Sequence, residues 1–430
     1  MSPALTASTR KPRAPGYTAL LGVPGFPRLY GGLLLGRVGG TMVSVALILF
    51  VLSRYHSPQL AGATAFFAIL PGLLVSPLAG ALLDRRGRAK FVVLDYLIAA
   101  CAIGLIATLA AVRSLPPPLL LTIVGLASLT NPLSSAGARS LFPILVPRKL
   151  WERANALDSS GHVLASLVGA PVAGALVGWV GGEWALAAAA VVFVMAAIVM
   201  LRLPDPATAG ATHGPVFRNA WLGLRYVARH PTLRGLALTL STYNMSFGIL
   251  EIALPVLVLS RLHMGPATVG FLWGGLGAAG LVSALVAGRL ASRGRERQMM
   301  VGAILVSAVA MTALPFASSL PVVAVAVCLV GAGNGPFDIG LFTLRQRRTD
   351  PAWFGRAFAV SMSVNYIGTP IGSALAGPLI GWTLNAALWT AVLMAFVGAV
   401  LAMTTIPAET GAATAPPIGR PEESVGLADS

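Results

Sequence analysis

The chain has 430 residues, of which 56% are hydrophobic and only 10% are charged, and its formal net charge is +16 at pH 7. A soluble protein carries about 25% charged residues, so this composition excludes an ordinary soluble domain and indicates an integral membrane protein. The positive charge would also suit a nucleic-acid-binding protein, but 26 of the 30 lysine and arginine residues lie in alternate connections and in the tails. We therefore expect the lipid bilayer, and no nucleic acid, as a partner.

Twelve apolar segments, each long enough to cross a bilayer as a helix, follow one another along the chain. An all-α integral membrane protein with twelve transmembrane helices is therefore predicted. The loops on one side carry only Arg54, Arg113 and Arg261, whereas the alternate loops are basic, so the positive-inside rule places the basic loops and both termini in the cytoplasm. The predicted spans cover residues 29–53, 58–83, 91–112, 117–138, 158–180, 183–203, 235–259, 266–288, 299–319, 321–343, 358–381 and 385–406.

The linker between the sixth and seventh spans has a helical pattern of its own. Apolar residues recur there at helical spacing against three arginines, which predicts an interfacial helix. The apolar residues are Phe217, Trp221, Leu224 and Val227, and the arginines are Arg218, Arg225 and Arg229. The predicted domains are a cytoplasmic tail (1–28), a six-helix bundle (29–203), this cytoplasmic linker (204–234), a second six-helix bundle (235–406) and a disordered cytoplasmic tail (407–430).

The sequence offers little that an enzyme would need. Cys101 and Cys328 both lie in apolar segments, where we expect small core thiols, and two cysteines supply no disulfide or metal framework. None of the three lysines precedes serine or threonine, so a phosphate-binding loop that ends in Gly-Lys-Ser/Thr is excluded. We expect no enzyme activity, no cofactor and no metal. The polar N-terminus, followed by a long apolar span, predicts no cleaved signal peptide.

The two halves of the chain are related by an internal repeat. A shift of 203 positions aligns residues 131–179 on residues 334–382 without a gap, with 13 identities over 49 positions. The matched pairs include Asn131 with Asn334 and Trp179 with Trp382. A shift of six helices keeps the orientation of each copy, which predicts two parallel six-helix repeats.

A short basic loop, Gly-Ala-Leu-Leu-Asp-Arg-Arg-Gly-Arg-Ala-Lys at 80–90, joins the second and third spans, and a weaker copy follows at 288–298. Asp84 stands at the inner end of its span, where a carboxylate can pair with an arginine or accept hydrogen bonds from a helix N-terminus. Such a bond would latch one half-bundle against the other and break when the halves move. The alternative is that the arginines of the loop only fix the topology.

With twelve spans, this repeat and this loop, the sequence resembles the major facilitator superfamily from about residue 28 to residue 406. The loop pattern of that family is matched by Gly80, Asp84, Arg85, Gly87 and Arg88. The second copy departs from it, because Ser292 stands where the acid would be. The resemblance implies secondary transport by alternating access, in which spans 1, 4, 7 and 10 line a central cavity.

Two further segments, 138–157 and 343–359, look like the branch of the family that holds bacterial siderophore and multidrug exporters. In the fifth span, Gly-Ala-Pro-Val-Ala-Gly-Ala at 169–175 is similar to the Gly-Pro-x-x-Gly-Gly motif of exporters. It departs from that motif at Ala170 and Ala175. The glycines of this span are most simply explained by close helix packing, with hinge bending as the secondary role.

Ionisable residues inside spans are costly and usually functional. Arg37 in span 1 and Asp338 in span 10 are expected to share the cytoplasmic half of the implied cavity and to form a pair that switches with protonation. The alternatives are a static pair that fixes the bundle, or side chains that snorkel to the membrane interface. Glu251 in span 7 is more isolated; it is either a proton carrier or a solvated carboxylate. Asp95 and Asp158 lie near predicted helix ends, where we expect boundary or structural charges.

Five polar residues are candidates for lining the cavity. Asn131 and Asn334 match each other across the repeat, on spans 4 and 10. His162 in span 5 aligns with Asn365 in span 11, and Tyr366 follows directly. Polar groups at matched depth suit a substrate cavity, although a hydrogen-bonded core histidine is an equally good explanation of His162.

Together these features predict a proton-coupled secondary transporter, a monomer in the bacterial inner membrane, that exports a small amphipathic or hydrophobic molecule such as a drug or a siderophore-like compound. The partners would be this substrate and protons. One alternative is an importer of a sugar or an organic acid. Another is a membrane receptor or scaffold that kept the fold and lost transport.

Overall fold

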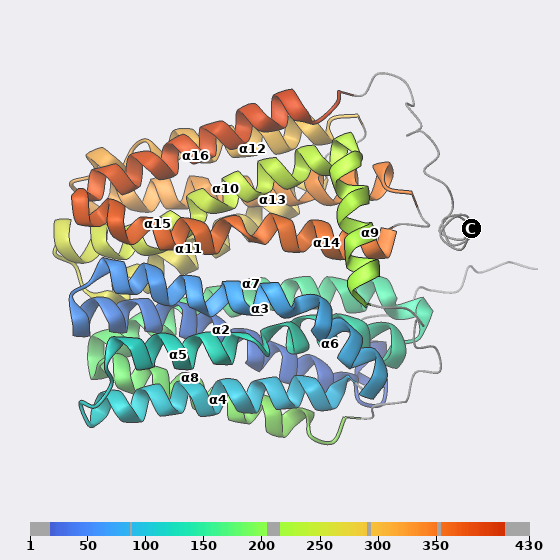
Figure 1. Cartoon of the computed structure of the whole chain (residues 1–430), viewed down its shortest axis with the longest axis horizontal. Coiled ribbons are helices and arrows are strands. Elements are labelled where there is room, and N and C mark those ends of the chain that lie inside the picture. Colours follow the sequence, from blue (N-terminus) through green and yellow to red (C-terminus); the bar gives the residue numbers. More distant parts are fainter. Residues whose placement is uncertain (1–17, 87, 204–215, 290–293, 351–353, 409–430) are drawn as a thin grey trace, which may run out of the picture.

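The computed structural model of the protein describes residues 18–86, 88–203, 216–289, 294–350 and 354–408, and every regular element within these ranges is helical. The long helices are apolar on all sides, because one side of each packs on other helices and the other is left for lipid. The expected all-α membrane fold is confirmed. Two side-by-side bundles make up the molecule, one from each half of the sequence (Figure 1).

The N-terminal bundle starts with a short helix and contains seven longer ones. In it, α2 packs against α7 and α8, and α4 packs against α8. The helices are α1 (Thr18–Leu21), α2 (Phe26–Tyr55), α3 (Pro58–Arg86), α4 (Ala89–Ala111), α5 (Pro117–Ser128), α6 (Asn131–Leu145), α7 (Trp151–Val180) and α8 (Gly182–Met200).

The C-terminal bundle repeats this organisation. In it, α10 packs against α15 and α16, and α13 packs against α11 and α12. Its helices are α10 (Pro231–Val256), α11 (Pro266–Ala287), α12 (Glu296–Met311), α13 (Leu320–Arg348), α14 (Phe354–Tyr366), α15 (Gly368–Trp382) and α16 (Leu384–Thr405).

Two of the predicted spans are interrupted. The fourth consists of α5 and α6, and the eleventh consists of α14 and α15. A proline inside a helix removes one backbone donor, and its ring clashes with the carbonyl group four residues earlier. Pro132 stands four residues after Ser128, the last residue of α5, and Pro370 stands four residues after Tyr366, the last residue of α14. The prolines therefore account for both breaks.

Eleven segments of the described chain are long and apolar enough to cross a membrane. The twelfth is the α14–α15 pair, in which each helix by itself is too short. The predicted twelve-helix architecture is consistent with this count, and the continuous helix predicted at 358–381 is corrected to two helices.

Two interfaces hold the bundles together, α7 against α11 and α3 against α15. The closest approaches lie at the end of the molecule that carries the turns at 56–57, 181, 262–265 and 383, here called the far end. A Cβ atom placed on Gly270 of α11 would lie 2.4 Å from the backbone oxygen of Ala170, and one on Gly377 of α15 would lie 2.5 Å from Cα of Gln59. Since real Cβ atoms do not come so close, glycine at these positions lets the two halves close backbone to backbone at the far end.

The opposite end is here called the α9 end, because α9 (Val216–Arg229) lies across it, at a steep angle to the spans (Figure 1). This helix contacts α14 and α10 of one half and α3 of the other. Trp221 and Leu224 are exposed, as are Arg225 and Arg229, whereas Val227 is buried. Of the predicted apolar face, Val227 thus packs against the protein, whereas Trp221 and Leu224 do not. The side chains of Phe217 and Arg218 lie outside the described residues.

Aromatic side chains are exposed at the far end. Trp179 of α7 and Trp382 of α15, which the repeat matches, are 79% and 81% exposed, and Trp184 and Phe316 are exposed as well. Indole rings prefer the boundary between the hydrocarbon and headgroup layers, so this set has the character of an aromatic belt.

The cysteines differ from the expectation. Cys101 of α4 and Cys328 of α13 are free and exposed, not buried in the core. The sequence pattern misled here because a helix that is apolar on every side gives no sign of which side faces its neighbours.

Candidate functional site

Two adjoining cavities lie inside the molecule. The larger, of about 570 Å³, is lined mainly by α7, α10, α11 and α13 and is called the C-terminal compartment. The other, of about 440 Å³, is lined mainly by α2 to α7 and is called the N-terminal compartment. Four residues line both: Ser44, Ile48, His162 and Glu251. Since these residues come from α2, α7 and α10, the wall between the compartments is built from both halves of the chain.

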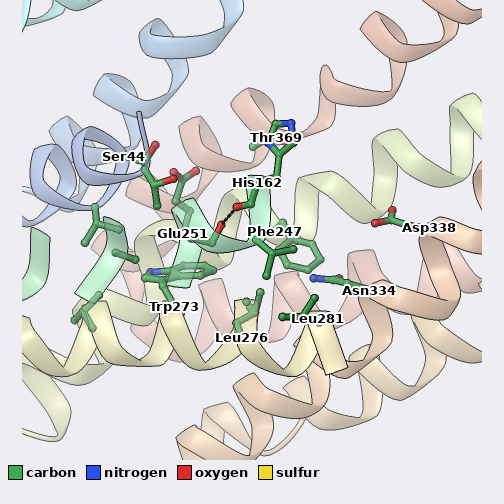
Figure 2. A pocket seen from close by; sticks show the side chains of 18 of the residues that line it. Ser44, His162, Phe247, Glu251, Trp273, Leu276, Leu281, Asn334, Asp338 and Thr369 are labelled. Carbon is green, nitrogen blue, oxygen red and sulfur yellow. Dashed lines mark hydrogen bonds between the residues drawn. The ribbon is translucent and has the colours of Figure 1, made fainter. Parts of the chain in front are cut away.

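The C-terminal compartment combines two carboxylates with aromatic rings. Glu251 of α10 and Asp338 of α13 both line it, together with Phe247 and Trp273 (Figure 2). In the view of Figure 2, Asp338 lies on the opposite side of Phe247 and Asn334 from Glu251. The compartment therefore holds two separated acidic groups within an apolar and aromatic lining.

Glu251 accepts a hydrogen bond from Ser373 of α15, the helix that forms the α3–α15 interface between the halves. Ser373 of α15 places its Oγ 3.4 Å from Glu251 Oε2, 3.2 Å from the backbone oxygen of Gly248 and 3.1 Å from that of Thr369. Because one hydroxyl hydrogen serves three acceptors, the bond to Glu251 can be exchanged for a bond to the backbone. A change in the charge of Glu251 is thus able to alter a contact of α15, the helix that packs on α3 of the other half.

In the N-terminal compartment, Arg37 of α2 is paired with Asp158 of α7. Arg37 Nη2 lies 2.5 Å from Asp158 Oδ1, and Nη1 lies 2.8 Å from the backbone oxygen of the same residue. The predicted pair between Arg37 and Asp338 is therefore wrong for this conformation. The predicted span began at residue 158, whereas α7 begins at Trp151, so Asp158 lies seven residues inside the helix.

Asp95 is a cavity residue that sequence reasoning missed. It was expected to be a boundary charge, but α4 begins at Ala89, and Asp95 lines the N-terminal compartment with 3% of its surface exposed. The available signal was a lone acid followed by an uninterrupted apolar run of helix.

The five predicted cavity residues divide into two groups. Asn131 lines the N-terminal compartment, Asn334 the C-terminal compartment, and His162 both. Asn365 and Tyr366 line neither of them. Asn365 is buried in α14, with its backbone oxygen 2.8 Å from Nδ2 of Asn244, and Tyr366 is 51% exposed at the break before α15. The structure brings the first group together with Glu251 and leaves the second outside the cavities.

The predicted gating loop is described only in part. The backbone of α3 continues to Arg86, but Gly87 and the side chains of Asp84 and Arg85 lie outside the described residues, as do the surroundings of Gly80. Arg88 Nη1 donates a hydrogen bond of 3.2 Å to the backbone oxygen of Ser140 in α6. This bond connects the loop to the broken fourth span.

The family model described as Major Facilitator Superfamily matches residues 29–372 and, in a second match, residues 236–425. The chain belongs to the Major Facilitator Superfamily. The two overlapping matches also fit the internal repeat, because one of them covers the C-terminal half separately.

Relatives within the Major Facilitator Superfamily cover most of the chain. An uncharacterized MFS-type transporter, y4rN of Sinorhizobium fredii, is 38% identical over 396 residues, which are 92% of this chain and 98% of that protein. The multidrug efflux pump Tap of Mycolicibacterium fortuitum is 28% identical and covers 82% of this chain and 88% of its own. The crystal structure of a bacterial homologue of the iron transporter ferroportin in an inward-facing state superposes with a TM-score of 0.70 at 18% identity, over 88% of this chain and 97% of that one. The chain is a membrane transporter of this superfamily.

Proposed function

We propose that the protein is a proton-coupled exporter of small amphipathic or hydrophobic molecules in the bacterial inner membrane, acting as a monomer by alternating access. The observation that carries the proposal is the position of Glu251 and Asp338, two carboxylates in an apolar and aromatic compartment beside the interfaces between the halves. Ionisable groups at such positions are usually part of an ion or substrate pathway. The similarity to the efflux pump Tap supports the direction of transport.

The closed far end supports alternating access. Gly270 and Gly377 allow the halves to touch backbone to backbone there, and we propose that the cavities behind this seal open toward the α9 end. If the basic loops are cytoplasmic, as the positive-inside rule predicts, this conformation faces the cytoplasm. Release of the substrate then requires the far end to open and the α9 end to close, by rocking of one half against the other.

Glu251 is the better placed of the two candidate proton carriers. It lines both compartments and contacts Ser373, so its protonation acts directly on α15 at an interface between the halves. A proton that crosses the membrane down about 100 mV releases roughly 2.3 kcal/mol, which is enough to drive a modest concentration gradient. Arg37 contributes by holding α7 through Asp158, and we propose that this pair, too, changes during rocking.

The predicted latch at Asp84 completes the proposal. A carboxylate at the end of α3 that bonds to the opposite half stabilises one of the two conformations and has to be released in each cycle. Asp84→Asn should lower turnover strongly while expression stays near normal. Normal transport by this variant would reduce the loop to a topology signal.

Everted membrane vesicles energised by respiration test the coupling, with ethidium as the transported probe and an acridine dye as the monitor of the proton gradient. The wild type should accumulate ethidium and partly dissipate the gradient. Glu251→Gln and Asp338→Asn should abolish both effects and retain downhill exchange of ethidium. Glu183→Gln, a carboxylate at the far end beside Arg54, is the matched control and should behave as the wild type.

Each result separates the candidate functions. Accumulation against the gradient by both single variants and by the double variant would exclude these acids as the proton carriers. Movement of the probe in the opposite direction would indicate an importer. Binding of the probe without any flux would indicate a receptor.

A further inference from the structure

Asp95 is a buried carboxylate that the proposed coupling scheme does not use. The hydroxyl groups of Ser134 and Thr130 are hydrogen-bonding neighbours of its carboxyl group. Its Oδ1, however, has no hydrogen-bond partner among the described residues, although only 3% of the residue is exposed. A buried ionised oxygen without a partner is costly, because neither water nor a donor compensates the lost hydration. Since Asp95 lines the N-terminal compartment, the missing partner can be supplied by a molecule that enters this cavity.

The protein itself does not supply a cation for Asp95 in this conformation. Among the described residues that line the N-terminal compartment, Arg37 is the only arginine or lysine. Its guanidinium is already bonded twice to Asp158, at 2.5 Å and 2.8 Å. The carboxyl groups that line this compartment belong to Asp95 and Glu251, so the lining holds two acids and no lysine or arginine that is free to pair with Asp95.

Two aromatic rings line the same compartment as Asp95. Tyr96 of α4 and Phe193 of α8 line the same compartment, with their ring centroids 5.9 Å apart. The Tyr96 ring is held in place by close packing on α2, because a Cβ atom on Gly36 would lie 2.4 Å from Tyr96 Oη. The rest of the lining is largely aliphatic, with Ile103, Ile106 and Val124 among its members. A carboxylate next to fixed rings and aliphatic surface suits an organic cation, which gains ionic, cation–π and hydrophobic contacts at once.

We propose that Asp95 binds the ammonium or amidinium group of an amphipathic organic cation, and that the N-terminal compartment is the cation subsite of the transport cavity. This inference rests on the proposed transport function and names the substrate class of that cavity. The N–H group of the cation donates to Asp95 Oδ1, the rings of Tyr96 and Phe193 flank the charge, and the apolar part extends toward Glu251 and the C-terminal compartment.

Equilibrium binding to the purified full-length protein in lipid nanodiscs tests this assignment without any proton gradient. The probes are dansylcadaverine, which carries a primary ammonium group, and its N-acetyl derivative, which is neutral and of nearly the same shape. The wild type should bind the ammonium probe about tenfold more tightly or better, as expected for a hydrogen bond to a charged partner. Asp95→Asn should remove this preference and leave the affinity for the neutral probe unchanged.

Two further variants separate a lost charge from a damaged fold. Asp95→Glu keeps the carboxylate and should keep the preference for the ammonium probe. Glu183→Gln removes a carboxylate that lines neither compartment and should bind both probes as the wild type does.

Four results would overturn the assignment: equal binding of both probes by the wild type, no binding of either, an unchanged preference in Asp95→Asn, or an equal loss of both affinities in Asp95→Asn. The last would give Asp95 a structural role only. Binding is measured without flux, so the two proposals are tested separately. A lack of proton coupling in vesicles would not contradict the cation subsite, and a lack of preference for the ammonium probe would not contradict proton coupling.

Discussion

Arg37 Nη2 lies 2.5 Å from Asp158 Oδ1, and Arg37 Nη1 lies 2.8 Å from the backbone oxygen of Asp158, so one guanidinium ties α2 to α7 through two hydrogen bonds. Both side chains are mostly buried, at 14% and 19% exposed. A cation held in this way cannot leave its partner without leaving two charges unpaired beside a largely apolar cavity lining.

Replacing one partner of this pair should therefore destabilise the folded protein more than replacing both partners. Arg37→Gln and Asp158→Asn each leave one mostly buried charge uncompensated, and each should lose about 1.5–3 kcal/mol of stability. The double variant should recover much of this loss, because no unpaired charge remains. Melting followed by tryptophan fluorescence in detergent, arranged as a double-mutant cycle, measures the coupling. Strictly additive losses would show that the pair contributes nothing.

The seal at the far end depends on the absence of a side chain at Gly270. In Gly270→Val, the new side chain would press on α7, since a Cβ atom there lies 2.4 Å from the oxygen of Ala170. Ordinary contacts need about 3.5 Å, so α7 and α11 must separate by roughly 1 Å, and the population should shift toward an open far end. Gly302→Val is the control, because a Cβ atom at Gly302 meets nothing within 4 Å.

Spin labels at Ser57 and Thr383 stand on the two sides of the α3–α15 interface at the far end. In a background without the two exposed cysteines, they should report the opening of the far end in Gly270→Val as a longer distance by double electron–electron resonance. The control variant should reproduce the distances of the parent protein. A parent-like distance distribution in Gly270→Val would mean that the helices adjust locally and that the glycine does not control the seal.

His230 should make the junction of α9 and α10 sensitive to acid. Its Nδ1 lies 3.5 Å from the backbone nitrogen of Leu233 and caps α10, and burial lowers the pKa of His230 below its usual value of 6.5. The unfolded chain then binds this proton at a higher pH than the folded protein does, so the stability contributed by neutral His230 is lost as the pH falls below about 6.5. The melting temperature should drop between pH 7 and pH 5.

His230→Asn is the matched variant for this effect, because asparagine is a good helix cap and does not titrate. It should melt near the wild type at pH 7 and lose less stability at pH 5. An identical acid response of the two proteins would assign the effect to other groups.

The orientation in the membrane remains a prediction from charge. Alkaline phosphatase fused after Leu115 or Arg261 should be active, because these residues stand in loops expected on the outer side. Fusions after Gly87 or Trp221 should be inactive. Activity of the second pair would reverse the assignment of sides and, with it, the conclusion that this conformation faces the cytoplasm.

Most of the fold could be predicted because hydropathy reports directly which segments enter the membrane. The two helix breaks could not be read from proline alone, because Pro171, Pro255 and Pro336 also stand inside predicted spans and their helices continue. They were missed because hydropathy averages over a span and does not register a local loss of helical geometry.

The site was harder to predict because helices extend beyond the apolar part of a span. Asp95 lies six residues inside α4 and Asp158 seven inside α7, although both stood at the edges of their hydrophobic segments. Asp338 is followed by ten more residues of α13 rather than five. Depth along a helix, and hence the partner of Arg37, depends on where the backbone starts to be helical, and hydropathy does not contain that information.

The exposed tryptophans at the far end have a mechanical consequence. Trp179 and Trp382 lie at the C-terminal ends of α7 and α15, and these helices form the two interfaces between the halves. Rings anchored in the headgroup layer resist vertical displacement when the hydrocarbon thickness changes. The length of the lipid acyl chains would then act on the two helices that form the seal, and the thickness of the bilayer would influence how readily the far end opens.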